Sequence, residues 1–115
     1  MIIYIQRILE LFKTSGALSA FLKWSKFSLA AFKIISRAKM AGVKPKTVVD
    51  VGANIGQFSV ASSHLFDGVV IYPIEPDPCV SEELRKNVGT LIAKNVKVMA
   101  VGDKNGVEIF HVNSD

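Results

Sequence analysis

The segment from Thr47 to Gln57 constrains the fold of this chain more than any other part of it. Three β-branched residues lead into Asp50, and a turn that contains Gly52 and Gly56 follows before a stretch compatible with a helix. Glycine accepts backbone conformations that other residues avoid, so such a turn can bend sharply and pass close to a small molecule. A strand, a glycine turn and a helix in this order place a ligand at the carboxyl end of a parallel strand. We therefore predict the beginning of a cofactor-binding α/β domain.

The residues after this turn alternate between helical and strand patterns. The predicted elements are a helix over 56–66, a strand over 69–74, a helix from 77 to 87 or 88, a third strand over 95–101, and a fourth, antiparallel strand over 107–112. Asp77 and Pro78 suit a helix start, because aspartate caps free amides and proline fits the first helical position. The last two strands would form a hairpin. This order predicts half of a doubly wound parallel α/β sheet with a terminal β-hairpin.

The residues before this domain have a helical pattern. We predict two helices between Ile2 and Lys39, broken near Ser15 and Gly16, and we divide the chain into a helical extension over 1–44 and an α/β domain over 45–115. The second helix, 17–39, carries one basic stripe made of Lys23, Lys26, Lys33 and Arg37. Two interpretations stay open: a helix that packs on the domain and solvates its charges, or an interfacial helix on anionic lipid.

Composition excludes several classes of function. The chain has 115 residues, half of them hydrophobic, and a net charge of +4. No block of like charge is interleaved with aromatic residues, so a nucleic-acid partner is not predicted. The single cysteine, Cys79, excludes an internal disulfide framework and indicates a reducing, cytoplasmic compartment. No metal-ligand spacing occurs, and no apolar run reaches the roughly 18 residues of a membrane-spanning helix.

Two acidic residues give the glycine turn its chemical character. A dinucleotide fold requires Gly-x-Gly-x-x-Gly, whereas Asn54 stands here where the second glycine would be. Asp50 would repel a pyrophosphate but suits a cationic group, or it makes a structural hydrogen bond within the turn. Glu75 directly follows the second strand, where a carboxylate can accept hydrogen bonds from both ribose hydroxyls; the alternative is an exposed loop carboxylate. Asp103 either borders a nucleoside base or is a hairpin-turn aspartate.

These motifs together resemble a known family. Residues 48–59, Val48 to Ser59, resemble the first motif of the FkbM-type methyltransferases, a branch of the S-adenosylmethionine-dependent class I fold. Residues 74–78 resemble the second motif of that family, and residues 87–88, 95–98 and 100–107 resemble its third segment in order and spacing. The resemblance implies a Rossmann-like fold and an S-adenosylmethionine site. The residues that it assigns to the cofactor are Asp50, Gly52, Ala53, Asn54, Gly56, Glu75, Pro76 and Asp103.

The resemblance also implies a reaction. Gly52 and Gly56 would let the loop pass the amino-acid part of the cofactor, Asp50 would anchor that loop or the ammonium group, Glu75 would bind the ribose, and Asp103 would border the adenine. The sulfonium methyl would pass to a hydroxyl of a small-molecule or glycan acceptor. The resemblance covers residues 47–112 without the family's later segments, so we expect one wall of the crevice, no assignable general base and no activity of this chain alone.

Two other functions are compatible with the sequence. The first is a fragment of an oxidoreductase that binds a nucleotide cofactor, which would need the missing glycine. The second is a degenerate, non-catalytic module that binds a partner or a membrane through residues 17–39. Binding of S-adenosylhomocysteine or of a dinucleotide distinguishes a methyltransferase from an oxidoreductase. Binding to anionic vesicles tests whether the non-catalytic module contacts a membrane.

Overall fold

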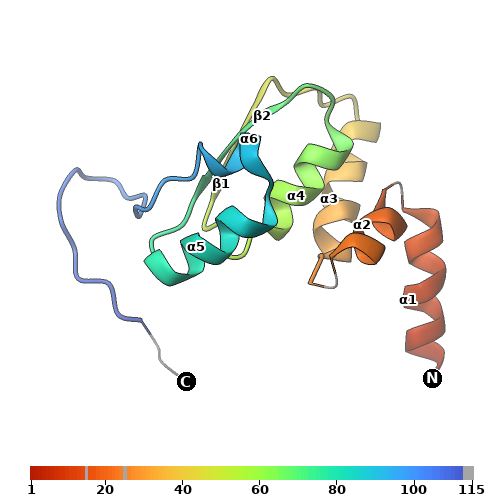
Figure 1. Ribbon diagram of the computed structural model, residues 1–115. Coiled ribbons are helices and arrows are strands. Elements are labelled where there is room, and N and C mark those ends of the chain that lie inside the picture. The colour runs from red at the N-terminus through yellow and green to blue at the C-terminus, as the bar shows by residue number, and fades with distance from the viewer. Residues whose placement is uncertain (15, 25, 113–115) are drawn as a thin grey trace.

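Helices and one small parallel sheet make up the ordered elements of the described chain (Figure 1). The computed structural model describes residues 1–14, 16–24 and 26–112, and within them the chain is a mixed α/β protein with six helices and two strands. The elements are α1 (Ile2–Lys13), α2 (Ala17–Lys23), α3 (Leu29–Met40), β1 (Thr47–Val51), α4 (Gln57–Leu65), β2 (Val70–Ile74), α5 (Pro78–Asn87) and α6 (Thr90–Ala93).

β1 and β2 form the sheet that the sequence predicts. They run parallel, with Thr47 opposite Val70 and Val51 opposite Ile74, and α4 connects them. Paired residues of neighbouring strands point to the same face of a sheet. The pair Asp50 and Pro73 lies on the buried face. The other face carries exposed apolar side chains, which are Val49, Val51, Val70 and Tyr72. The described residues thus cover one face of the sheet.

α4 lies between two hydrophobic clusters and contributes residues to both of them. On one side Ala61 and Leu65 pack with α2 and α3 in a cluster formed by Ala17, Ala20, Ala31, Phe32, Ile35, Ala61 and Leu65. On the other side Val60 packs with α5 in a cluster formed by Ala53, Val60, Leu84, Val88 and Val96. Because α4 directly follows the glycine turn, both clusters fix the direction in which the chain leaves that turn. The division at residue 44 stays a prediction, although α3 packs directly on α4.

The N-terminal region differs from the prediction of two helices. The break near Gly16 is confirmed, with Gly16 at φ 75° before α2, whereas Ser15 lies outside the described residues. The continuous helix over 17–39 is wrong, because Trp24 is extended and Ser28 begins a new helix by accepting a hydrogen bond from the Ala31 amide at 3.2 Å.

The predicted basic stripe is lost with that helix. Lys26 lies between α2 and α3, and its Nζ is 2.7 Å from a carboxylate oxygen of Glu83 in α5. Lys33 of α3 pairs with Glu10 of α1 at 2.9 Å. Two of the four predicted stripe residues therefore link elements of the protein to one another.

The predicted third strand over 95–101 is reduced to one parallel bridge between Ile74 and Lys97. The Lys97 amide donates to Pro73 O at 2.9 Å, and Lys97 O accepts from the Glu75 amide at 3.0 Å. Toward the N-terminus this pairing does not continue at Asn95. Pro73 has no N–H to donate to the Asn95 carbonyl, and Ile71 O accepts a hydrogen bond from the Asn95 side chain at 3.0 Å.

Toward the C-terminus the ladder positions beyond Lys97 are also occupied. Glu75 O accepts from the Ser81 hydroxyl at 3.0 Å, and the Asp77 amide donates to the Glu75 side chain at 3.1 Å. The predicted hairpin is wrong as well: residues 98–112 contain no strand, and they run away from the sheet as an extended tail (Figure 1). The short helix α6, after Gly89, was not predicted.

Candidate functional site

The turn between β1 and α4 is fixed to the end of β2. The amides of Gly52 and Ala53 both donate to the carbonyl of Ile74, each at 2.9 Å. Three residues of the turn have positive φ, namely Gly52 at 73°, Asn54 at 51° and Gly56 at 99°. Asparagine tolerates the left-handed region better than most residues, which explains why it can replace glycine at position 54. The turn is therefore held close to the residue that follows β2.

Glu75 is that residue, and its carboxylate binds the turn. One oxygen accepts a hydrogen bond from the Asn54 amide at 2.9 Å, and the other accepts from the Asp77 amide at 3.1 Å. The side chain is buried, with 8% of the residue exposed, so Glu75 is not an exposed loop carboxylate. The structure thus brings Glu75 and the glycine turn together at the carboxyl end of the sheet. Binding of ribose by Glu75 stays a prediction.

Asp50 lies on the buried face of β1 and connects this strand to α4. Its Oδ2 accepts a hydrogen bond from the Ser59 hydroxyl at 2.6 Å, and only 8% of the residue is exposed. Burial raises the pKa of the Asp50 carboxyl above its ordinary value, and hydrogen bonds from the Ser59 side chain and backbone partly oppose this shift. Asp50 therefore makes a structural hydrogen bond, as one of the two interpretations predicted, although its partner is a helix serine and not an amide of the turn.

The two glycines of the turn lie in different surroundings. A Cβ atom at Gly52 would meet nothing within 4 Å, so this residue leaves open space beside the turn. A Cβ atom at Gly56 would lie 2.7 Å from Val88 Cγ1 and 2.8 Å from Leu84 Cδ1. Gly56 thus permits close packing of the turn on α5, and Gly52 is the glycine that leaves the backbone accessible to a ligand.

The remaining predicted residues separate into two groups. Ala53 is buried in the cluster between the turn and α5, and Pro76 directly follows Glu75 and is half-buried. Asp103 is exposed in the tail that leaves the sheet, and no hydrogen bond joins it to the turn within the described chain. Its placement as a hairpin-turn aspartate is wrong, since that hairpin does not form.

Three residues that support the site were not found from the sequence. Ser59 holds Asp50, Ser81 holds the carbonyl of Glu75, and Asn87 donates from its side chain to Ile55 O at 2.8 Å. Both serines are fully buried. The available signal was a hydroxyl at a position where the helix otherwise presents apolar residues to the core.

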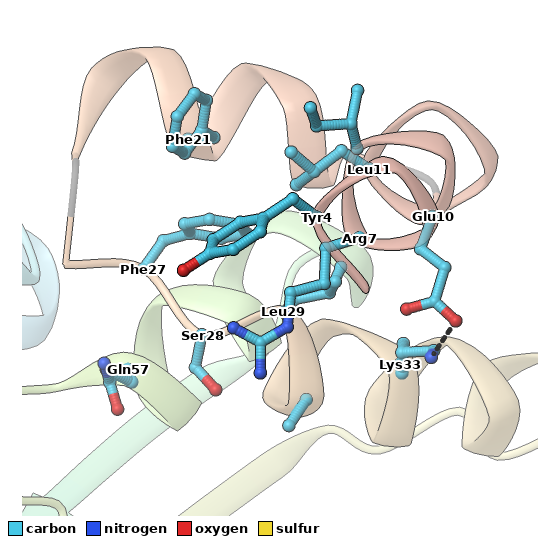
Figure 2. A pocket seen from close by; sticks show the side chains of 12 residues that line it. Tyr4, Arg7, Glu10, Leu11, Phe21, Phe27, Ser28, Leu29, Lys33 and Gln57 are labelled. Carbon is cyan, nitrogen blue, oxygen red and sulfur yellow. Dashed lines mark ion pairs between the residues drawn. The ribbon is translucent and has the colours of Figure 1, made fainter. Parts of the chain in front are cut away.

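Two pockets among the described residues lie away from the turn. A pocket of about 620 Å³ lies between α1, α2 and the start of α3, and Figure 2 shows Tyr4 and Arg7 of α1 beside it. A second pocket, of about 360 Å³, lies between Phe66 and the residues around α6. None of the predicted cofactor residues lines either pocket. Gln57, the first residue of α4, lines the larger pocket and directly follows Gly56 of the turn.

Comparison with protein-family models, with curated proteins and with solved structures found no match. The motif residues and their geometry are therefore the features from which a function is inferred.

Proposed function

We propose that the turn at residues 52–56 and Glu75 form part of an S-adenosylmethionine site, and that this chain belongs to a methyltransferase that acts on hydroxyl acceptors. The observation that carries the proposal is the buried Glu75 carboxylate, 2.9 Å from the Asn54 amide of the glycine turn. A carboxylate at the end of the second strand, beside a glycine turn at the end of the first, is the arrangement that binds an adenosine ribose in doubly wound folds.

The proposed fold is the first half of such a doubly wound sheet. β1, α4, β2 and α5 follow one another as two strand–helix units, and the bridge at Lys97 marks where a third strand would join β2. Ligands of these sheets bind outside the carboxyl ends of the strands. Both the glycine turn and Glu75 lie at that end.

Charge favours a cationic ligand over a dinucleotide. The Glu75 carboxylate lies beside the glycine turn and is largely buried. It would repel a pyrophosphate held by this turn, because low dielectric strengthens repulsion between like charges. S-Adenosylmethionine carries a sulfonium and an ammonium group, both of which this carboxylate attracts. The open space beside Gly52 supports contact of its amino-acid part with the backbone.

The chain's contribution to the reaction is positioning. When bound, S-adenosylmethionine supplies an electrophilic methyl group, and a hydroxyl acceptor gives up a proton as it is methylated. Glu75 would hold the sugar and the turn would hold the amino-acid part, so that the methyl group has a fixed direction. In such a transfer, alignment of donor and acceptor accounts for much of the rate enhancement.

Titration calorimetry with S-adenosylhomocysteine tests the proposal directly. The full chain should bind this product, and Glu75→Gln should bind it on the order of 10- to 100-fold more weakly, because hydrogen bonds to a charged group are lost. Glu82→Gln removes an exposed carboxylate of α5 and serves as the control, with unchanged affinity. Circular dichroism establishes that each variant is folded at the temperature of the titration.

A second pair of variants tests the turn without touching Glu75. Gly52 and Gly68 both have positive φ and both have open space around the position of a Cβ atom, but only Gly52 lies at the proposed site. Gly52→Ala should weaken binding of S-adenosylhomocysteine, and Gly68→Ala should not. Preferential binding of NAD or FAD by the unmodified chain, or equal affinity of Gly52→Ala and Gly68→Ala for S-adenosylhomocysteine, would refute the assignment.

A further inference from the structure

Helix α1 presents an apolar face that nothing in the described chain covers. Ile2, Ile5, Leu9 and Phe12 recur three or four residues apart and therefore share one side of the helix. Between 50% and 73% of each of these residues is exposed, and α1 contains no buried residue. Exposed apolar side chains that gather on one helix face indicate a contact surface.

The side of α1 that faces the protein is the more polar one. Glu10 pairs with Lys33 of α3 at 2.9 Å, and Arg7 and Tyr4 lie beside the pocket between α1 and α3 (Figure 2). Leu11 alone of the α1 residues packs against the core cluster of α2, α3 and α4. A helix that packs on its own domain presents its apolar stripe to the core, whereas α1 directs Ile2, Ile5, Leu9 and Phe12 away from it.

The distribution of charge indicates what this face contacts. Residues 1–46 contain nine lysines and arginines and a single acidic residue, Glu10, whereas residues 47–115 contain five basic and nine acidic residues. On a helical projection Lys13 lies at one border of the apolar face of α1, next to Ile2, whereas Arg7 lies on the opposite side, toward the pocket. A cationic side chain in the position of Lys13 can reach lipid phosphates while the apolar side chains enter the membrane. A second copy of the chain would instead bring two strongly basic regions together.

We propose that α1 lies in the plane of an anionic membrane surface, with Ile2, Ile5, Leu9 and Phe12 in the acyl boundary and the basic residues of the N-terminal helices at the headgroups. Twelve residues make a helix of about 18 Å, shorter than the roughly 30 Å of a hydrocarbon core. Consistent with this, none of the described helices is long and apolar enough to cross a membrane. This assignment moves the predicted lipid contact from residues 17–39 to α1, and it is independent of methyl transfer.

Co-sedimentation of the full chain with vesicles tests the proposal. The chain should bind phosphatidylcholine vesicles that contain phosphatidylglycerol, and high salt or pure phosphatidylcholine should reduce the binding. Leu9→Ser with Phe12→Ser should lower the partition coefficient on the order of tenfold or more, because two apolar side chains no longer enter the bilayer. The control, Val107→Ser with Ile109→Ser, removes two exposed apolar side chains of the tail and should bind as the unmodified chain does.

A charge variant and a measurement of mass complete the test. Lys13→Gln should weaken binding on the order of fivefold, whereas Lys94→Gln, at an exposed lysine outside the N-terminal helices, should have a smaller effect. Three results would overturn the proposal: no binding to anionic vesicles, equal binding by the Leu9 and Phe12 variant, or, by light scattering, a dimer that this variant dissociates. The last result would assign the face to a second copy of the chain.

Discussion

Replacement of Gly56 by alanine should destabilise the protein more than the same replacement at Gly52. Gly56 has φ 99° and Gly52 has φ 73°, so alanine at either position adopts a left-handed conformation that costs about 1–2 kcal/mol. Only at Gly56 does the new methyl group also collide with Val88 Cγ1 at 2.7 Å and Leu84 Cδ1 at 2.8 Å. Overpacking of this kind costs about 1–3 kcal/mol. We therefore expect a loss of about 2–5 kcal/mol for Gly56→Ala and about 1–2 kcal/mol for Gly52→Ala.

Urea unfolding followed by tryptophan fluorescence measures both variants. Trp24 is the single tryptophan and packs against the cluster that contains Leu84 and Val88, so its emission reports on the site of the collision. Val88→Ala supplies a double-mutant cycle: in the Gly56→Ala background it should cost on the order of 1 kcal/mol less than in the unmodified chain, because it removes the nearest colliding atom. If Gly56→Ala lost no more stability than Gly52→Ala, the close packing of the turn on α5 would be refuted.

Three further variants test individual contacts. Because burial raises the pKa of Asp50, folding favours the protonated form of this carboxyl. Its contribution to stability should be complete below pH 3.8 and be lost as the pH rises through the folded-state pKa. Urea unfolding across pH should show that Asp50→Asn lacks this decline, and a decline of equal size in both proteins would contradict the prediction. Asp77→Ala should lower the free energy of unfolding by about 1 kcal/mol, because the Asp77 side chain accepts from the amides of Cys79 and Val80; an unchanged urea midpoint would argue against this cap. Ser62→Ala should leave the melting temperature unchanged or raise it, because within the described chain the buried Ser62 hydroxyl has no hydrogen-bond partner; a clear fall would reveal one.

The elements that the sequence predicted correctly have their causes within a few neighbouring residues. β1 and β2 are branched apolar runs, α4 starts directly after the glycine turn, and the cap at Asp77 fixes the start of α5. The position of Glu75 beside the turn also followed, because the carboxyl ends of adjacent parallel strands meet at one edge of a sheet.

The third strand failed because of contacts between distant residues. It is limited by the Asn95 side chain on Ile71 O and by Ser81 on Glu75 O, neither of which periodicity can reveal. The helix over 17–39 failed for a local reason, because Ser28 starts a new helix within the predicted range. A serine that precedes Leu29 was the available signal for a new helix start.

Through the two hydrogen bonds that it accepts, the Glu75 side chain connects two backbone segments. One oxygen holds residue 54 and the other holds residue 77, so a sugar that draws on this carboxylate shares it with both amides or displaces one of them. Recognition at this point is thereby tied to the shape of the turn and to the first residues before α5. Aspartate has the same charge but is one methylene shorter, so it would have difficulty spanning both segments, and the length of this side chain matters here as much as its charge.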